Sequence, residues 1–371
     1  MATIRSVATI AVVLCFFMGG EAFTGEQALS GKTMAFDIEA HRGGRALFPE
    51  NTLPSFANAL SMGVDTLELD IGVTSDQAIV VSHERGLNPD LARTADGVYV
   101  APPGIPFVQL RLEDVKKYDV GQIRPSSAYA AQFPDQHAVP GTPIPTLKEV
   151  FDLVRKSGDR HVRLNIETKI DPNHPEQSPD PERFVGLLLD LLRTEKFSDR
   201  VMVQSFDWRT LQLVQNLAPA IPTVYLTQQA GSGATVFADK ASIWTAGFNP
   251  IDHGGSLPRA IKAAGGAIWS PFFGDVNPAL ISESHSLGLA VVVDGEQASR
   301  HRAHDRHRGG RNYLRSSRSL AQDRRRQGHR RANGIVGCAV DRPGPAPGSM
   351  LKSVKRWIVR SLAVPCPHQT V

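Results

Sequence analysis

The chain has 371 residues, of which 41% are hydrophobic and 21% charged, so its composition is globular and its length allows one large or two ordinary domains. The net charge of +4 misrepresents the main body, because residues 300–331 contain 12 arginines, no lysine and two aspartates and therefore carry +10. The remainder carries −6, so the basic isoelectric point gives no reason to expect a nucleic-acid partner.

The first residues have the pattern of a secretory signal. Arg5 is followed by an apolar run over 7–18 and by the small-x-small site Gly20-Glu-Ala22. The apolar run is short for a membrane span, so an uncleaved anchor is the weaker alternative. We therefore expect a signal peptide at 1–22, a linker at 23–33, export to the periplasm or the extracellular space, and no stable membrane span after cleavage.

The expected strand at 34–40 leads into His41-Arg42, two glycines and then Pro49-Glu50-Asn51-Thr52. Glycines permit a tight turn with positive φ, and Thr52 is a suitable N-cap for a helix over 52–63. Polar groups thus gather where a strand ends and a helix begins, which is where α/β folds build their sites. For His-Arg-Gly by itself, a basic turn without chemistry is the better explanation.

The next strand, 64–72, alternates apolar residues on one face with Glu68 and Asp70 on the other. A solvated sheet edge is the common explanation, but two buried carboxylates need a cation, and Mg²⁺ or Ca²⁺ prefers such oxygen ligands. The strand at 78–82 follows after too few residues for a parallel crossover, so we expect a hairpin that returns His83 to the neighbourhood of Asp70. A histidine beside two carboxylates is an acid–base candidate.

Residues 85–145 are rich in proline, glycine and polar groups, which is typical of an inserted functional lobe or lid. The strand at 162–169 then places Glu167 and Lys169 on one face. These two side chains are either a plain ion pair or a further metal ligand and a phosphate-binding ammonium.

Strands and helices alternate over most of 34–293, without a dinucleotide fingerprint or a Walker loop. Further strands are expected at 201–207, 223–227, 267–270 and 290–293, and further helices at 146–154, 182–196, 207–217, 257–264 and 277–287. The alternation favours an α/β fold of the (β/α)₈ TIM-barrel type over an open doubly wound sheet, and the hairpin makes the barrel irregular.

Six motifs occur together in order and at similar spacing: His41-Arg-Gly43, Pro49-Glu-Asn-Thr52, Glu68-Leu-Asp70, His83-Glu-Arg-Gly-Leu-Asn-Pro-Asp90, Asn165-Ile-Glu-Thr-Lys169 and Gln204-Ser-Phe-Asp207. In this combination the chain resembles the glycerophosphodiester phosphodiesterases, in particular exported forms with an insert after the second motif histidine. The resemblance covers about 34–293. It implies a phosphodiesterase barrel that hydrolyses small-molecule glycerophosphodiesters to glycerol 3-phosphate and an alcohol.

The resemblance also implies roles for single residues. It implies a divalent cation, Ca²⁺ or Mg²⁺, on Glu68, Asp70 and Glu167, with His41 and His83 as the acid–base pair. It implies that Arg42 and Lys169 contact the phosphate, that Glu50 and Asn51 are supporting residues, and that Phe206 and Trp269 line an alcohol pocket. Relatives with such a histidine pair suggest attack by the neighbouring glycerol hydroxyl through a cyclic phosphate, with direct attack by water as the alternative.

The resemblance ends after Val293, where the family would have a last βα unit. Residues 294–371 instead form a basic tail, which is interpreted as a shifted reading frame in preference to an anion-binding arm or a disordered tail. With its last βα unit missing or scrambled, the barrel is expected to keep open strand edges and the chain to fold poorly or show low activity. A phospholipase acting on lipid headgroups and an inactive phosphodiester-binding relic are the alternative functions.

Overall fold

The computed structural model describes residues 37–293 and the backbone of residues 354–358. The predicted signal peptide, the linker, the first residues of the strand expected at 34–40 and most of the 294–371 tail lie outside the described residues. Within 37–293, no helix is long and apolar enough to cross a membrane.

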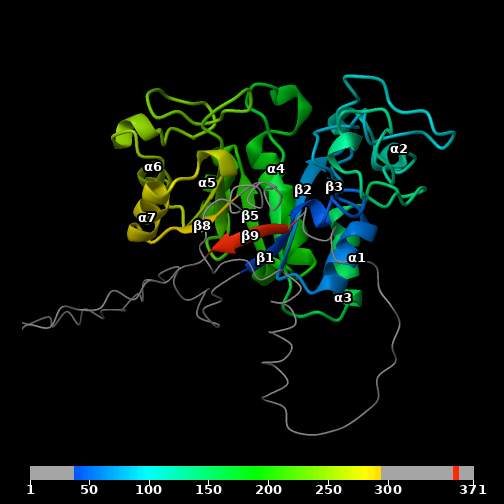
Figure 1. Ribbon diagram of the computed structural model, residues 1–371, viewed down its shortest axis with the longest axis horizontal. Coiled ribbons are helices and arrows are strands. Elements are labelled where there is room, and N and C mark those ends of the chain that lie inside the picture. Colours follow the sequence, from blue (N-terminus) through cyan, green and yellow to red (C-terminus); the bar gives the residue numbers. More distant parts are fainter. Residues whose placement is uncertain (1–36, 294–353, 359–371) are drawn as a thin grey trace, which may run out of the picture. The chain divides into compact units, whose positions relative to one another are not determined.

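The strands form one sheet whose pairings close into a ring, β1-β2-β4-β5-β6-β7-β8-β9 and back to β1 (Figure 1). They are β1 (Asp37–Ala40), β2 (Thr66–Val73), β3 (Ile79–Val81), β4 (Arg163–Thr168), β5 (Val201–Ser205), β6 (Thr223–Thr227), β7 (Ile268–Pro271), β8 (Ala290–Val292) and β9 (Val354–Ile358). Neighbours from β1 through β8 are parallel along the ring, with β3 attached to β2 outside it. The expected irregular (β/α) barrel is therefore confirmed.

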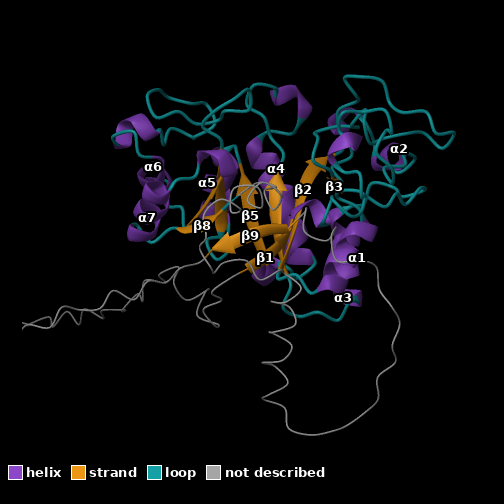
Figure 2. Cartoon of the chain, in the orientation of Figure 1, coloured by secondary structure: helices purple, strands orange, loops and turns teal. Residues whose placement is uncertain are grey.

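The helices lie around the strands (Figure 2). They are α1 (Leu53–Met62), α2 (Leu112–Val115), α3 (Leu147–Lys156), α4 (Pro181–Thr194), α5 (Trp208–Leu217), α6 (Leu257–Ala263) and α7 (Pro278–Ser286). Their predicted starts are confirmed where a cap was visible in the sequence. The Thr52 hydroxyl accepts a hydrogen bond from the Ser55 amide at the start of α1, and Thr146 and Glu149 form a capping box at α3.

The largest core fills the space between the strands and these helices, because parallel strands bury both faces. Phe56 of α1, Phe151 of α3 and Trp208 of α5 are each fully buried in it. A smaller apolar cluster, with Met202 and Val224 among its members, lies on neighbouring strands. Each buried aromatic side chain contributes about 2–3 kcal/mol to folding. The packing in these two apolar clusters therefore holds the strands, and the site residues at their ends, in place.

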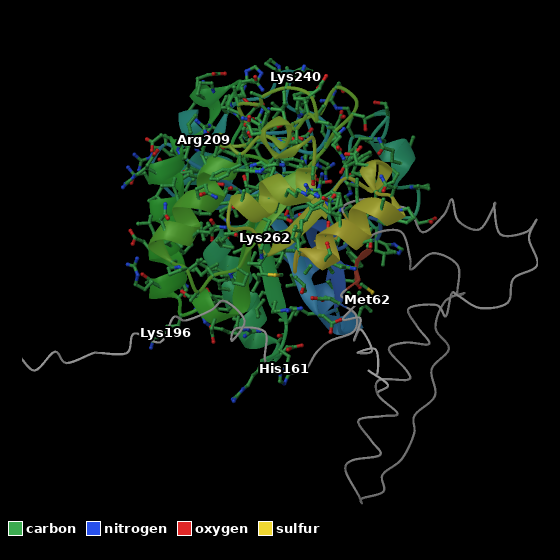
Figure 3. The ribbon with its side chains drawn as sticks, turned by 90° about the vertical axis from the view of Figure 1, so that its left-hand side faces the viewer. Met62, His161, Lys196, Arg209, Lys240 and Lys262 are labelled. Carbon is green, nitrogen blue, oxygen red and sulfur yellow. The ribbon has the colours of Figure 1, made fainter. Side chains whose placement is uncertain are left out.

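The two ends of the barrel are distinct. In Figure 3, His161, which precedes β4, and Lys196, which precedes β5, lie at one end, and Lys240, in the loop after β6, lies at the other. Side chains at the carboxyl ends of the parallel strands therefore share the end at which Lys240 lies. That end is where barrels of this type build their sites.

The predicted hairpin is confirmed. β3 pairs antiparallel with β2, Ile71 opposite Val81, and the Ser82 amide donates to the Asp70 carbonyl over 2.9 Å. The insert that follows has its own apolar core, in which Leu87, Phe107 and Val115 are buried. Residues 85–145 thus form a packed lobe beside the barrel, next to the hairpin that carries His83.

The eighth place in the ring is taken by β9. Its backbone pairs antiparallel with both β1 and β8, with Val354 opposite Ala40 and Trp357 opposite Val292. The expectation of open edges on β1 and β8 is wrong for the backbone, because both edges have a hydrogen-bonded partner. In a regular barrel of this type the eighth strand is parallel to its neighbours, whereas β9 runs antiparallel to both of its neighbours.

Candidate active site

The turn after β1 is built on unusual backbone angles. Arg42 has φ of 50° and Gly43 has φ of 75°, inside a short 3₁₀ turn, His41–Gly43. A Cβ at Gly43 would lie 2.5 Å from the Ser55 hydroxyl, so glycine lets this turn approach helix α1 closely. The Arg42 amide donates to Glu68 Oε2 over 2.6 Å. A positive φ at a non-glycine residue costs about 1–3 kcal/mol and is typical of functional sites.

Three carboxylates meet beside this turn. Glu68 and Asp70 come from β2 and Glu167 from β4, all three are buried, and one oxygen from each lies within 4.8 Å of the others. Among the residues that the structure describes, buried Asp70 Oδ1 has no hydrogen-bond partner. Three converging oxygen donors, one lacking a hydrogen bond, fit a hard divalent cation. The two carboxylates of one strand face and the third of the neighbouring strand are together as predicted.

Two cations of the protein balance part of this charge. Lys169 Nζ lies 2.7 Å from Glu167 Oε1 and 3.7 Å from Asp70 Oδ1, and Arg42 Nε lies 3.8 Å from Asp70 Oδ2. Burial alone would raise the pKa of Asp70, but His83, Lys169 and Arg42 outweigh it and hold this pKa well below its usual range. Burial raises the pKa of Glu167 to about 8 against the opposing charge of Lys169. The two cationic side chains therefore do not fully neutralise the three carboxyl groups, and a further cation would be bound favourably.

The two predicted histidines flank this cluster. His41 Nε2 lies 3.9 Å from Glu68 Oε2, and His83 follows the hairpin strand paired to the segment that carries Asp70. His83 Nδ1 lies 2.9 Å from Glu84 Oε1. A carboxylate can only accept, so Nδ1 carries the hydrogen and Nε2 keeps its lone pair. Burial and the charges of Arg42 and Lys169 hold the pKa of His83 well below its usual range, so its ring is neutral near pH 7.

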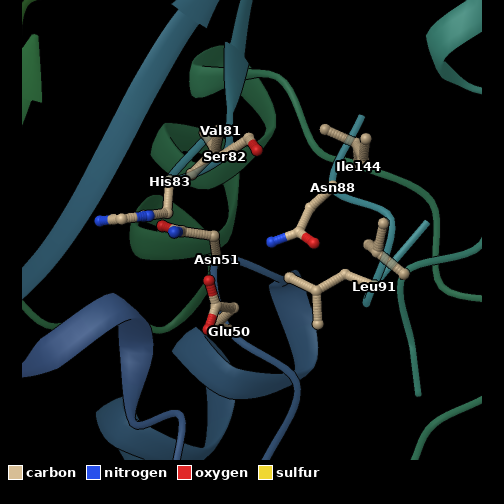
Figure 4. Close-up of a pocket in the computed structure, with 9 residues that line it drawn as sticks. Glu50, Asn51, Val81, Ser82, His83, Asn88, Leu91 and Ile144 are labelled. Carbon is tan, nitrogen blue, oxygen red and sulfur yellow. The ribbon is translucent and has the colours of Figure 1, made fainter. Parts of the chain in front are cut away.

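Each of the two residues expected to have a supporting role contacts another residue of the site. Glu50 Oε1 accepts a hydrogen bond from Arg42 Nη1 over 2.9 Å, and Asn51 Nδ2 donates to Asp70 Oδ2 over 2.9 Å. A small pocket of about 20 Å³ lies between this motif and the insert, with Glu50, Asn51 and His83 on one side and Asn88 and Leu91 on the other (Figure 4). Its volume suits a single water molecule, not a substrate.

The two aromatic residues expected to line an alcohol pocket differ in exposure. Phe206, directly after β5, is half-buried. Trp269 on β7 has no exposed surface, and its Nε1 donates to Thr227 Oγ1 over 2.9 Å. The assignment of Trp269 as pocket lining is therefore corrected, since its indole is an element of the barrel core with its polar atom already paired.

Three further residues join the site. Gln204 on β5 donates from Nε2 to Glu68 Oε1 over 2.7 Å, Glu84 contacts His83 as described, and the Tyr129 hydroxyl of the insert donates to Glu50 Oε2. Gln204 was detectable, since it stands on the next strand opposite Glu167. Nothing local in the sequence indicates Tyr129, because its contact depends on the path of the inserted lobe.

The arrangement as a whole defines a class of site. It combines a carboxylate cluster suited to a divalent cation, two cationic side chains, and two imidazoles, of which that of His83 is neutral near pH 7. Charge neutralisation beside an acid–base pair is what cleavage of a phosphodiester requires.

Comparisons with known proteins agree with this class. Residues 41–329 match the glycerophosphoryl diester phosphodiesterase family, and the chain belongs to that family. The match continues beyond Val293, further than the motifs on which the resemblance rested.

Individual relatives are similar over the barrel. Glycerophosphodiester phosphodiesterases of Caldanaerobacter subterraneus subsp. tengcongensis and Bacillus subtilis are 32% and 30% identical over 52% and 57% of this chain. The chain spans about two thirds of the length of these relatives, 66% and 67%. The crystal structure of a protein of this family from Silicibacter pomeroyi has 32% identity and a TM-score of 0.61 over 69% of this chain and 82% of its own.

Proposed function

We propose that this protein hydrolyses glycerophosphodiesters, such as glycerophosphocholine, to glycerol 3-phosphate and an alcohol. The observation that carries the proposal is the convergence of His41, His83 and the Glu68–Asp70–Glu167 cluster at the carboxyl ends of adjacent strands. Relatives at 30–32% identity that are named glycerophosphodiester phosphodiesterases support it. One divalent cation, Ca²⁺ or Mg²⁺, is proposed as the cofactor, held by the three carboxylates.

The residues of the chain divide the work around the phosphate. A cation on the carboxylates would neutralise charge at the phosphate oxygens. The guanidinium of Arg42 and the ammonium of Lys169 add positive charge and fix the phosphate in place. Both side chains already lie against the carboxylates, at 3.8 Å and 3.7 Å from Asp70, so they border any phosphate bound at the cluster.

The two imidazoles carry the protons. Neutral His83, with its lone pair on Nε2, accepts the proton of the attacking hydroxyl, and His41 protonates the departing alkoxide. The glycerol hydroxyl next to the phosphate attacks first: a new oxygen–phosphorus bond forms, the bond to the alcohol breaks, and a cyclic phosphate results. Water then opens the ring with the two histidines in reversed roles. Analysis of the early products for a cyclic glycerol phosphate tests this order, and its absence under single-turnover conditions favours direct attack by water.

The decisive experiment measures release of glycerol 3-phosphate from glycerophosphocholine with and without a chelator, for the wild type and for His41→Ala. Activity that is lost with the chelator, restored by Ca²⁺ or Mg²⁺ and absent in His41→Ala supports the proposal. Activity unaffected by both changes contradicts it. Intact phosphatidylcholine serves as a second substrate, and preferential cleavage of the intact lipid would assign a phospholipase instead.

We also propose that the protein acts in the periplasm or outside the cell. Support comes from the signal pattern at residues 1–22. Cell fractionation of the full chain, with N-terminal sequencing of the recovered protein, tests this. Recovery with Met1 intact from the cytosol would contradict it.

A further inference from the structure

Tyr129 of the inserted lobe contacts the side of the site that carries Arg42. Tyr129, at the start of a short turn in the lobe, donates its hydroxyl hydrogen to Glu50 Oε2. The other oxygen of the same carboxylate accepts from Arg42 Nη1 over 2.9 Å. A continuous series of side-chain hydrogen bonds therefore runs from the lobe to the guanidinium that lies beside Asp70.

Several contacts hold Tyr129 in this place. Its ring meets Phe133 edge-on with centroids 5.1 Å apart, and the Arg45 guanidinium lies 5.1 Å above the Phe133 ring. Arg45 Nη1 also donates to the Tyr129 hydroxyl over 3.2 Å and lies 3.9 Å from Glu50 Oε2. Aromatic pairs and cation–π contacts of this kind each add about 0.5–1.5 kcal/mol of preference for one arrangement.

The backbone and core of the lobe reinforce the same contact. The His137 amide donates to the Leu47 carbonyl over 2.8 Å, and the Gln136 side chain donates to the Arg45 carbonyl over 2.6 Å. Ala46 of the turn after β1 shares a small apolar cluster with Phe133. The segment around 129–137 is thus packed directly against the turn that carries Arg42.

Glu50 is 6% exposed, so its carboxylate oxygens depend on protein donors. With Tyr129 on one oxygen, the carboxylate presents the other to Arg42 in a fixed orientation. If the hydroxyl is removed, we expect the buried Glu50 carboxylate to turn toward Arg42 or Arg45, which would change the orientation of the Arg42 guanidinium.

We propose that Tyr129 is a positioning residue for the phosphate-binding Arg42 and acts through Glu50, which gives the inserted lobe a part in substrate binding. This inference rests on the proposed function only for the assumption that Arg42 contacts the phosphate. Tyr129 itself is not expected to touch the reacting atoms. Its removal should therefore weaken phosphate binding more than it slows the chemical step.

The test uses Tyr129→Phe in the full chain, which removes the hydroxyl and keeps the ring against Phe133. Inorganic phosphate is the probe, measured by calorimetric titration in the presence of Mg²⁺ and as an inhibitor of glycerophosphocholine hydrolysis. We expect its dissociation constant and KM to rise about tenfold, equivalent to about 1.4 kcal/mol, with a smaller change in kcat.

Tyr99→Phe is the matched control, because the Tyr99 hydroxyl is in the same lobe and donates to the Gln122 carbonyl over 3.2 Å, away from Glu50. It should leave phosphate binding unchanged. A second comparison makes Tyr129→Phe in a Glu50→Gln background, where no further loss is expected if the hydroxyl acts through the carboxylate. Equal phosphate affinity of Tyr129→Phe and wild type, or an unchanged tenfold loss in the Glu50→Gln background, overturns the inference.

These outcomes are separable from those of the proposed function. A wild type that hydrolyses no glycerophosphodiester but binds phosphate, with Tyr129→Phe weakened, refutes the function and supports the positioning role. A wild type that hydrolyses glycerophosphocholine, with Tyr129→Phe unchanged in KM and phosphate inhibition, supports the function and refutes the positioning role.

Discussion

Replacing Gly43 with alanine should destabilise the protein by about 2–5 kcal/mol, a range that follows from two separate costs. The first is the positive φ of 75°, which disfavours any residue with a Cβ by about 1–2 kcal/mol. The second is steric, because the new Cβ would lie 2.5 Å from Ser55 Oγ and 2.8 Å from Phe56 Cδ1, and overpacking of this kind costs about 1–3 kcal/mol.

Gly63 is the matched control. Its φ of 72° is nearly the same, but a Cβ there would meet no atom of the described residues within 4 Å. Gly63→Ala should therefore cost only about 1–2 kcal/mol. Urea unfolding followed by circular dichroism measures the free energy of unfolding of both variants. In thermal unfolding, Tm should fall by about 3 °C for each kcal/mol in a domain of this size. Equal destabilisation by the two substitutions would refute the steric part of the reasoning.

Three further outcomes are expected. The affinity for Mg²⁺ or Ca²⁺ should rise by up to about tenfold per pH unit between pH 6 and 8, and binding should release a proton. The reason is that burial raises the pKa of Glu167 to about 8 and the metal binds the deprotonated carboxylate. Calorimetry in which the affinity does not change with pH would contradict this. Burial raises the pKa of Asp37 to about 6 despite Arg163, so its contribution to stability is present below about pH 4 and lost as pH rises through 6. Asp37→Asn should accordingly gain up to about 3 kcal/mol relative to wild type between pH 4 and 7 in urea unfolding, and a constant difference would argue against it. Arg42→Lys should lower kcat/KM about tenfold to a hundredfold. An ammonium lacks the two-pronged geometry with which a guanidinium can contact Glu50 and a phosphate oxygen together. Kinetics equal to those of the wild type would show that this geometry is not needed.

The parts of the fold that were predictable depend on short-range rules. The caps at Thr52 and Thr146 set the starts of two helices, because an unpaired amide needs a nearby oxygen whatever the rest of the chain does. The short connection at 74–77 forced a hairpin, since a parallel crossover is geometrically impossible over that length. From the hairpin, the meeting of His83 with Asp70 followed directly.

The parts that were not predictable depend on how distant segments pack. The spacing of Trp269 on its strand was visible, but whether its indole faces substrate or core depends on the neighbouring strand, which offers Thr227 as a partner. Tyr129 lies 79 positions from Glu50 in an insert without a clear periodicity. Strand β9, which runs antiparallel to β1, was not predicted, because the strand–helix alternation up to Val293 indicated a barrel whose ring strands are parallel.

The position of β9 bears on where this protein can be shortened. The family match stops at residue 329, and a chain cut there would keep everything that the match covers. Residues 354–358 lie beyond that boundary, yet their backbone stands between β1 and β8, and Val354 is opposite Ala40, the residue before His41. Trimming the chain to its recognisable part would therefore remove the strand that pairs with β1 directly before His41, the residue proposed to protonate the departing alkoxide.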